Sequence, residues 1–119
     1  MQRQAIDRLL EILESARKRK YMYFQPVAPV TVIHWLHGLR TGFSFAGLEW
    51  SHEHRRVVVE GRGLEFRVGA WENEELERRG LTAEAVVDEL IAIEIEMWQS
   101  QRADIAEQVA AADGGRDVG

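Results

Sequence analysis

The feature that most constrains this fold is a long stretch of unbroken helical periodicity over residues 82–112. Thr82 can cap its start, and Glu84 lies in its first turn. Apolar residues recur along it in two stripes, the first Val86, Leu90, Ile93 and Met97, the second Val87, Ile91, Ile95, Trp98, Ile105 and Val109. A helix that is apolar over so wide an arc packs on two sides. The sequence therefore predicts a central helix, which is also a plausible homodimer interface.

Three other segments favour helix. Residues 3–19 carry apolar side chains at helical spacing, and Thr31 can cap a second helix that reaches about Ala46. Pro26 and Pro29 force an extended connection between these two segments. Residues 71–79 have acids at the start, arginines at the end and Gly80 just beyond, which predicts a short helix.

Residues 50–68 fit two structures. Val57, Val58 and Val59 favour a strand, and the glycines at 61 and 63 can form the turn of a small hairpin. The alternative is a helix from about Ser51 to Glu60, with Ser51 as N-cap and Gly61 as C-cap. In that helix Trp50, His54, Val57, Val58 and Gly61 would share one face. Local preference alone slightly favours the hairpin.

Composition excludes several classes of protein. The 119 residues suit one domain, which we place at residues 1–112 with a disordered tail at 113–119. The absence of cysteine excludes thiolate metal sites and thiol nucleophiles and fits a reducing cytoplasm. A net charge of −5 argues against a nucleic-acid binder and favours a basic partner. No apolar run approaches the ~18 residues of a membrane span. We therefore expect a cytoplasmic protein that binds neither membrane nor nucleic acid and carries no cofactor.

Four histidines raise the question of a metal site. His34 and His37 lie three residues apart on the polar face of the second predicted helix, and His52 and His54 follow in the next segment. A metal needs at least a third ligand and supporting contacts, which these residues provide only if the two segments fold together. We expect solvated or locally paired histidines, with a site of all four as the alternative.

Glu94 is the most unusual residue of the last predicted helix, because it projects between the two apolar stripes. A buried carboxylate is costly unless it is paired. One interpretation is a catalytic or ligand-binding carboxylate. The other, which we favour, is a salt bridge to an arginine of another helix, such as Arg17 or Arg40. The serines lie in no nucleophile motif of the G-x-S-x-G type, so we expect no enzyme.

Two groups of residues are candidates for binding another protein. The first is an acidic surface patch, and the second is a pair of aromatic residues that we expect to be exposed and to act as interface anchors. The acidic patch consists of Glu72, Glu74, Glu75 and Glu77, and the aromatic pair is Tyr21 and Phe45.

The string ARKRKYMYFQ followed by VIHWLHGLRTGFSFAG resembles small uncharacterised bacterial proteins, in which a helix leads into an R-P-x-M-Y-x-G-like segment. RGLTAEAVVDELIAIEIEMW resembles their closing helix. Here Lys20 replaces the proline of that segment and Gln25 its glycine. Some such proteins are immunity-type inhibitors or come from mobile gene cassettes. The resemblance also implies helix at residues 51–61, and with local preference nearly balanced we predict helix there.

The predicted fold is therefore all-α, a compact bundle of four or five helices with the long C-terminal helix at its centre. The alternative is an α+β fold with one small hairpin at about 56–68. The leading hypothesis for function is a non-enzymatic, acidic protein-binding module, such as an immunity-like inhibitor or a mobile-element accessory protein. Two alternatives remain. One is a small metal-binding protein or enzyme that uses the histidines. The other is a helical protein that binds a small molecule.

Overall fold

The computed structural model describes residues 2–117, with side chains through residue 112, and confirms the all-α prediction. No strand occurs among the described residues, so residues 56–68 form no hairpin. One helix was not predicted from the sequence, namely α2, a single turn before the segment that contains Pro26 and Pro29. The helices are α1 (Gln2–Lys18), α2 (Lys20–Tyr23), α3 (Pro29–Phe45), α4 (His52–Gly61), α5 (Asn73–Arg78) and α6 (Ala83–Asp117).

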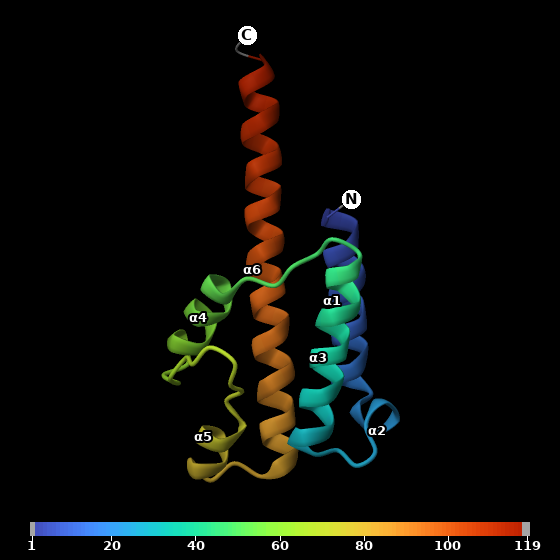
Figure 1. Cartoon of the computed structure of the whole chain (residues 1–119), viewed down its shortest axis with the longest axis vertical. Coiled ribbons are helices and arrows are strands. Elements are labelled where there is room, and N and C mark those ends of the chain that lie inside the picture. Colours follow the sequence, from blue (N-terminus) through green and yellow to red (C-terminus); the bar gives the residue numbers. More distant parts are fainter. Residues whose placement is uncertain (1, 118–119) are drawn as a thin grey trace.

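Helix α6 is the centre of the bundle, as its two stripes predicted. It packs against α1, α3, α4 and α5. Figure 1 shows α4 and α5 on one side of α6 and α1 and α3 on the other. Both stripes are buried as far as Trp98. Because the chain itself covers the second stripe there, a homodimer interface on this stripe would have to use residues beyond Trp98, where Ile105 is half-buried and Val109 exposed.

Side-chain caps fix two of the helix starts. The Ser51 hydroxyl accepts a hydrogen bond from His54 N at 3.3 Å, and the Thr82 hydroxyl accepts one from Ala85 N at 3.2 Å. Both N-caps agree with the sequence prediction. Helix α3 instead begins at Pro29, two residues before the predicted cap, because proline is well tolerated in a first helical turn.

The end of α4 corrects two predictions. Gly61 is its last helical residue rather than its C-cap, and the left-handed residue is Gly63, with φ of +74°. Gly63 N and Leu64 N return to carbonyls of the last turn, at 2.9 and 3.1 Å. The buried face of α4 carries Arg55 and Val59, whereas Val57, which we placed on that face, is exposed.

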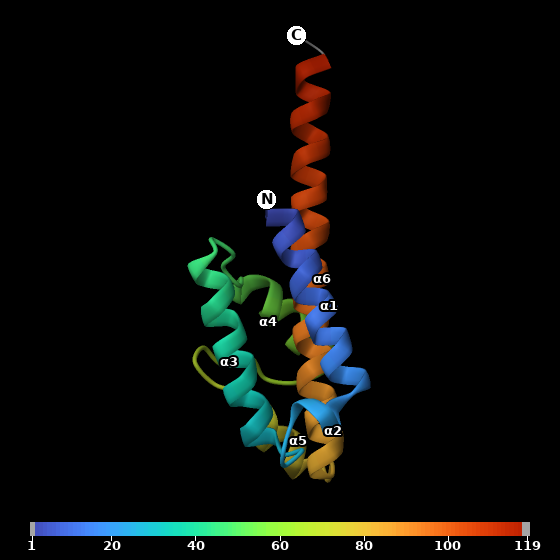
Figure 2. The ribbon, with the colours of Figure 1, turned by 90° about the vertical axis from the view of Figure 1, so that its right-hand side faces the viewer.

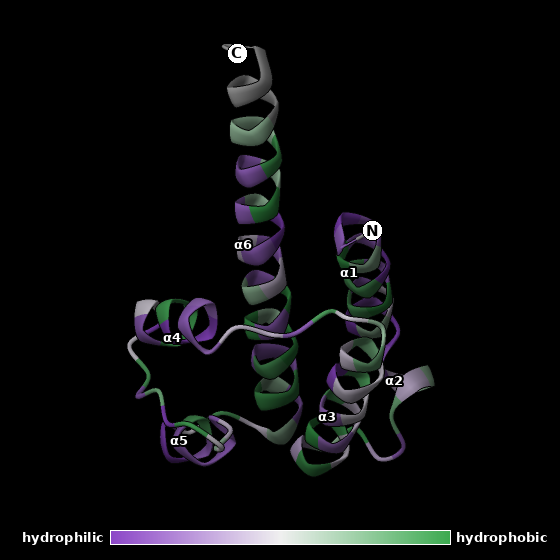
Figure 3. Cartoon of the chain, turned by 45° about the horizontal axis from the view of Figure 1, so that its top comes forward, coloured by the Kyte–Doolittle hydropathy of each residue, from purple (hydrophilic) through white to green (hydrophobic). Residues whose placement is uncertain are grey.

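The C-terminal part of α6 extends beyond the other helices. Figure 2 shows it continuing past the start of α1, and the longest dimension of the molecule is 57 Å. Hydrophobic residues dominate α6 inside the bundle, whereas hydrophilic ones interrupt them in the projecting part (Figure 3). The described helix runs to residue 117, into the segment that we predicted as a disordered tail. Residues 118–119 of that tail lie outside the described residues. None of the described helices combines the length and apolarity needed to cross a membrane.

A polar cluster links α2 to the first turn of α6 and lowers the pKa of one of its carboxyl groups, that of Glu84. Tyr21 donates a hydrogen bond to Glu84, and Lys20 Nζ lies 2.9 Å from the same carboxylate and 2.8 Å from Asp88. The Tyr21 and Lys20 hydrogen bonds hold the pKa of the Glu84 carboxyl below its ordinary value. A carboxyl whose pKa is lowered by folding adds stability above its unfolded pKa and loses that contribution as the pH falls through the folded pKa.

We therefore expect Tyr21→Phe to raise the pKa of Glu84 toward its ordinary value, because the hydroxyl is the largest cause of the shift. Carboxyl-detected NMR titration of Glu84 measures this. Tyr23→Phe is the matched control, since Tyr23 Oη donates to Ser15 at 2.9 Å and leaves Glu84 untouched. An unchanged Glu84 titration in Tyr21→Phe would show that the cluster does not form.

Candidate functional site

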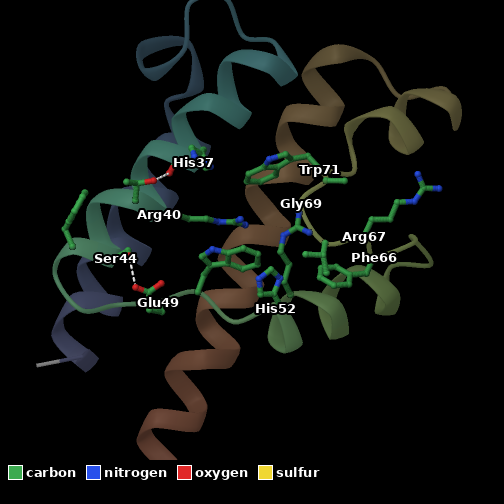
Figure 4. A pocket seen from close by; sticks show the side chains of 15 residues that line it. His37, Arg40, Ser44, Glu49, His52, Phe66, Arg67, Gly69 and Trp71 are labelled. Carbon is green, nitrogen blue, oxygen red and sulfur yellow. Dashed lines mark hydrogen bonds between the residues drawn. The ribbon is translucent and has the colours of Figure 1, made fainter.

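A cavity of about 410 Å³ lies between the C-terminal half of α3, the start of α4 and the 62–72 connection (Figure 4). This volume is in the range of small-molecule sites. The structure thus contains the kind of cavity that a small-molecule binder requires. Its walls are aromatic, and its positive charges are guanidinium groups. The aromatic walls are Trp50, Phe66 and Trp71, and the arginines are Arg40, Arg55 and Arg67.

Arg40 is held rigidly at the edge of this cavity. Its Nε donates to Glu94 Oε2 at 2.7 Å, and its Nη2 donates to Glu94 Oε1. Its guanidinium carbon lies 4.2 Å from the ring centre of Trp50 and 4.5 Å from that of Trp71. Figure 4 shows Arg40 reaching from α3 toward the space beneath Trp71. A guanidinium fixed by a carboxylate and two indoles keeps one orientation.

Glu94 itself is buried, with 1% of its surface exposed, and it also accepts a hydrogen bond from Trp98 Nε1 at 3.2 Å. Arg40 is one of the two arginine partners that the sequence indicated for it. The carboxylate is thus fully engaged by protein donors. Its role in the structure is to orient Arg40 from behind the cavity.

A second buried ion pair lies on the α4 side of the cavity. Arg55 Nη1 donates to Glu72 Oε2 at 2.8 Å, and Arg55 Nη2 donates to Glu72 Oε1. Both side chains are at most 3% exposed. The Arg55 guanidinium carbon is 5.2 Å from the Trp71 ring centre, so one indole contacts both guanidinium groups. Arg55 Nε is buried and has no acceptor among the described residues.

The mouth of the cavity carries both apolar and polar side chains. Phe45 is 90% exposed and Val68 75% exposed, and both line the cavity where it meets solvent. The His52 ring lies against Trp50, with ring centres 4.1 Å apart. The carboxylate of Glu49 accepts a hydrogen bond from Ser44 at the rim. Arg67 is also exposed there, whereas the guanidinium groups of Arg40 and Arg55 lie deeper inside.

The structure does not bring the four histidines together. His37 and His52 both line the cavity, and His34 is exposed on α3. His54 lies apart, between Ser51 and Asp104. Among residues 2–117, no group of three potential ligands is placed to hold a metal ion.

The acidic patch is smaller than the sequence predicted. Glu72 is buried in an ion pair with Arg55 and is therefore not part of the surface. A buried carboxylate is stable only when it is paired in this way. Glu75 is partly covered, pairs with Arg79 at 2.7 Å and accepts a hydrogen bond from Glu65 N. Glu74 and Glu77 remain exposed.

The two candidate aromatic anchors are exposed but do not form one surface. Tyr21 is 62% exposed on α2, next to the start of α6, whereas Phe45 ends α3 at the mouth of the cavity. Since α2 leads into the opposite end of α3, the length of that helix separates them (Figure 1).

Ser51, His54 and Asp104 form a chain of polar contacts that the sequence did not indicate. Ser51 Oγ lies 2.7 Å from His54 Nδ1, and His54 Nε2 contacts the Asp104 carboxylate. The same Ser51 oxygen caps α4, and Ser51 N donates to Gln101 Oε1 at 2.9 Å. These contacts tie the start of α4 to α6, and none of the three residues lines the cavity, although Trp50 and His52 on either side of Ser51 do. We assign them a structural role.

Sequence reasoning missed Arg55, Trp50 and Trp71 as parts of one site. Arg55 and Val59 are four residues apart, and this spacing could have placed an arginine on the buried face of α4. The acid that pairs with Arg55 comes from the far side of a connection without regular structure, so no local pattern identifies Glu72 as its partner.

Comparison with known proteins gives no match to any protein family model, curated protein or solved structure. The resemblance to small bacterial immunity-type proteins therefore stays a prediction. The function has to be inferred from the geometry of the site.

Proposed function

We propose that this chain is a binding protein for a small, flat organic ligand, which occupies the cavity between α3, α4 and the 62–72 connection. The observation that carries the proposal is Arg40, which Glu94, Trp50 and Trp71 hold in one orientation at the edge of an aromatic cavity. Its Nη1 has no acceptor among the described residues. A fixed donor at the edge of a cavity with aromatic walls fits the usual arrangement of a ligand site, in which a few polar groups orient an apolar body.

The cavity also favours binding over the other functions that the sequence left open. Its guanidinium groups are donors without acceptor capacity and do not exchange protons at neutral pH. They suit recognition, and His37 and His52 are the lining groups that can also exchange protons. The acidic protein-binding hypothesis is weakened by the burial of Glu72, and its remaining exposed carboxylates, Glu74 and Glu77, lie on α5.

A substitution that fills the cavity tests the proposal, because it should abolish ligand binding. Thr41 lines the cavity from α3, so Thr41→Phe should fill part of it, whereas His34→Phe places the same side chain at an exposed position of the same helix. We expect aromatic fragments to bind the wild-type chain in ligand-observed NMR, and the indole N–H signals of Trp50 and Trp71 to shift. This binding should be lost in Thr41→Phe and retained in His34→Phe.

Two results would contradict the proposal. Fragments that bind Thr41→Phe as well as wild type would be bound elsewhere on the molecule. A diverse aromatic library without any fragment that shifts the two indole signals would show that the cavity does not accept ligands.

A further inference from the structure

We infer that the ligand of this cavity is a monoanionic aromatic acid whose carboxylate is bound by Arg40, with Arg55 supplying a second positive charge close by. This inference rests on the proposed function and specifies its ligand class. It is supported by two buried ion pairs, each of which presents its arginine, and not its carboxylate, to the cavity. Arg40 and Arg55 line the cavity, whereas their carboxylates, Glu94 and Glu72, are buried behind them and do not line it.

From inside the cavity a ligand therefore meets three arginines and a single carboxylate, Glu49, which already accepts a hydrogen bond from Ser44. Both buried guanidinium carbons lie within about 5 Å of the Trp71 ring centre. No more than about 10 Å then separates the two charges, a distance over which charges still interact inside a protein.

Two donors of these arginines are unmet by the protein. Arg40 Nη1 has no acceptor among the described residues, and neither has Arg55 Nε, whose side chain is only 2% exposed. Arg55 Nε is enclosed by protein atoms, whereas Arg40 Nη1 is not. An acidic oxygen is the strongest acceptor for a guanidinium group, so an acid bound here would turn the unmet Arg40 donor into a charge-assisted hydrogen bond.

The buried carboxylates also set the charge of the ligand. Glu94 and Glu72 compensate the charges of Arg40 and Arg55, and Glu65 pairs with Arg67 at 3.1 Å, so the site has no surplus of positive charge for a dianion. A ligand with a single acid group is therefore the one that we infer. The indole and phenyl walls favour a flat apolar body next to the acid group. A carboxylate on an aromatic ring system satisfies both requirements.

Matched acids and amides test this inference. The probes are phenylacetate with phenylacetamide and 1-naphthylacetate with 1-naphthylacetamide, titrated into the ¹⁵N-labelled chain. Each pair differs mainly in charge. We expect each acid to bind about tenfold more tightly than its amide or better, because hydrogen bonds to charged groups are roughly twice as strong as neutral ones.

The variant Arg40→Gln/Glu94→Gln removes the donor without leaving an unpaired buried charge. It should lose about tenfold in affinity for the acids and little for the amides. Arg62→Gln/Glu89→Gln is the control, since it removes an ion pair of 2.6 Å outside the cavity, together with the contact of Arg62 to the half-exposed Glu96, and it should bind as wild type does.

The outcomes separate this inference from the proposed function. Equal binding of acid and amide, lost in Thr41→Phe, would overturn the acid inference and leave the cavity a ligand site. A preference for acids that survives in Arg40→Gln/Glu94→Gln would show that Arg40 is not the carboxylate anchor and would also overturn it. No binding of any acid or amide would count against both.

Discussion

Glu94→Gln is expected to lower the free energy of unfolding by about 3–5 kcal/mol, the usual cost of removing one partner of a buried ion pair. The Arg40 side chain is only 10% exposed, so water from the cavity replaces the lost carboxylate only in part. Trp98 Nε1 also loses its charged acceptor. Urea denaturation followed by circular dichroism measures the change. The same variant should increase the mobility of Arg40, which relaxation of its Nε–H signal reports.

Two controls show whether the loss of stability in Glu94→Gln comes from the unpaired charge that it leaves buried. Glu89→Gln breaks a half-exposed contact to Arg62 and should cost less than about 1 kcal/mol. Arg40→Met/Glu94→Met removes both charges and should recover most of the stability, because an apolar pair of similar volume often replaces a buried ion pair without loss. If Glu94→Gln is as stable as Glu89→Gln, Glu94 is not buried against Arg40.

Trp98→Ala should destabilise the chain by a similar amount, about 3–5 kcal/mol, because it removes a large buried side chain and leaves a void beside α6. Trp98 is 1% exposed. The matched control is Phe45→Ala, in which an aromatic side chain that is 90% exposed is removed at a cost below about 0.5 kcal/mol.

Thermal and urea unfolding of both variants give the comparison directly. Equal losses in Trp98→Ala and Phe45→Ala would mean that Phe45 is covered in solution, for instance by another molecule. Negligible losses in both would contradict the central position of α6, since Trp98 belongs to one of its two buried stripes.

The sequence was most informative where local chemistry decides the structure. Thr82 and Ser51 both cap helices at the predicted residues, because a hydroxyl at an N-cap acts within its own turn. The two stripes of α6 correctly indicated a helix packed on both sides. Glu94 was identified as unusual from its place between the stripes, and one of the two arginine partners considered for it, Arg40, is the one in the structure.

The site itself was largely beyond sequence reasoning, because its members meet only through tertiary packing. Glu72 lies in an acidic segment that predicts a surface patch, yet it is buried in an ion pair with Arg55, 17 residues earlier in the chain. Trp50 and Trp71 come from two connections, where no periodicity predicts which way an indole faces. The histidine pattern was equally ambiguous, and only the fold places His37 and His52 at one cavity and His54 elsewhere.

The order of the helices along the chain has a consequence for biosynthesis. Helices α1, α3, α4 and α5 all precede α6, yet all four pack against it. A nascent chain that has released the first five helices from the ribosome still lacks the surface on which they assemble. Short isolated helices are marginal in water, so these segments would fluctuate until α6 emerges. Cooperative folding would then follow the synthesis of residues 83–105, which leaves the apolar faces of the earlier helices accessible to chaperones during translation.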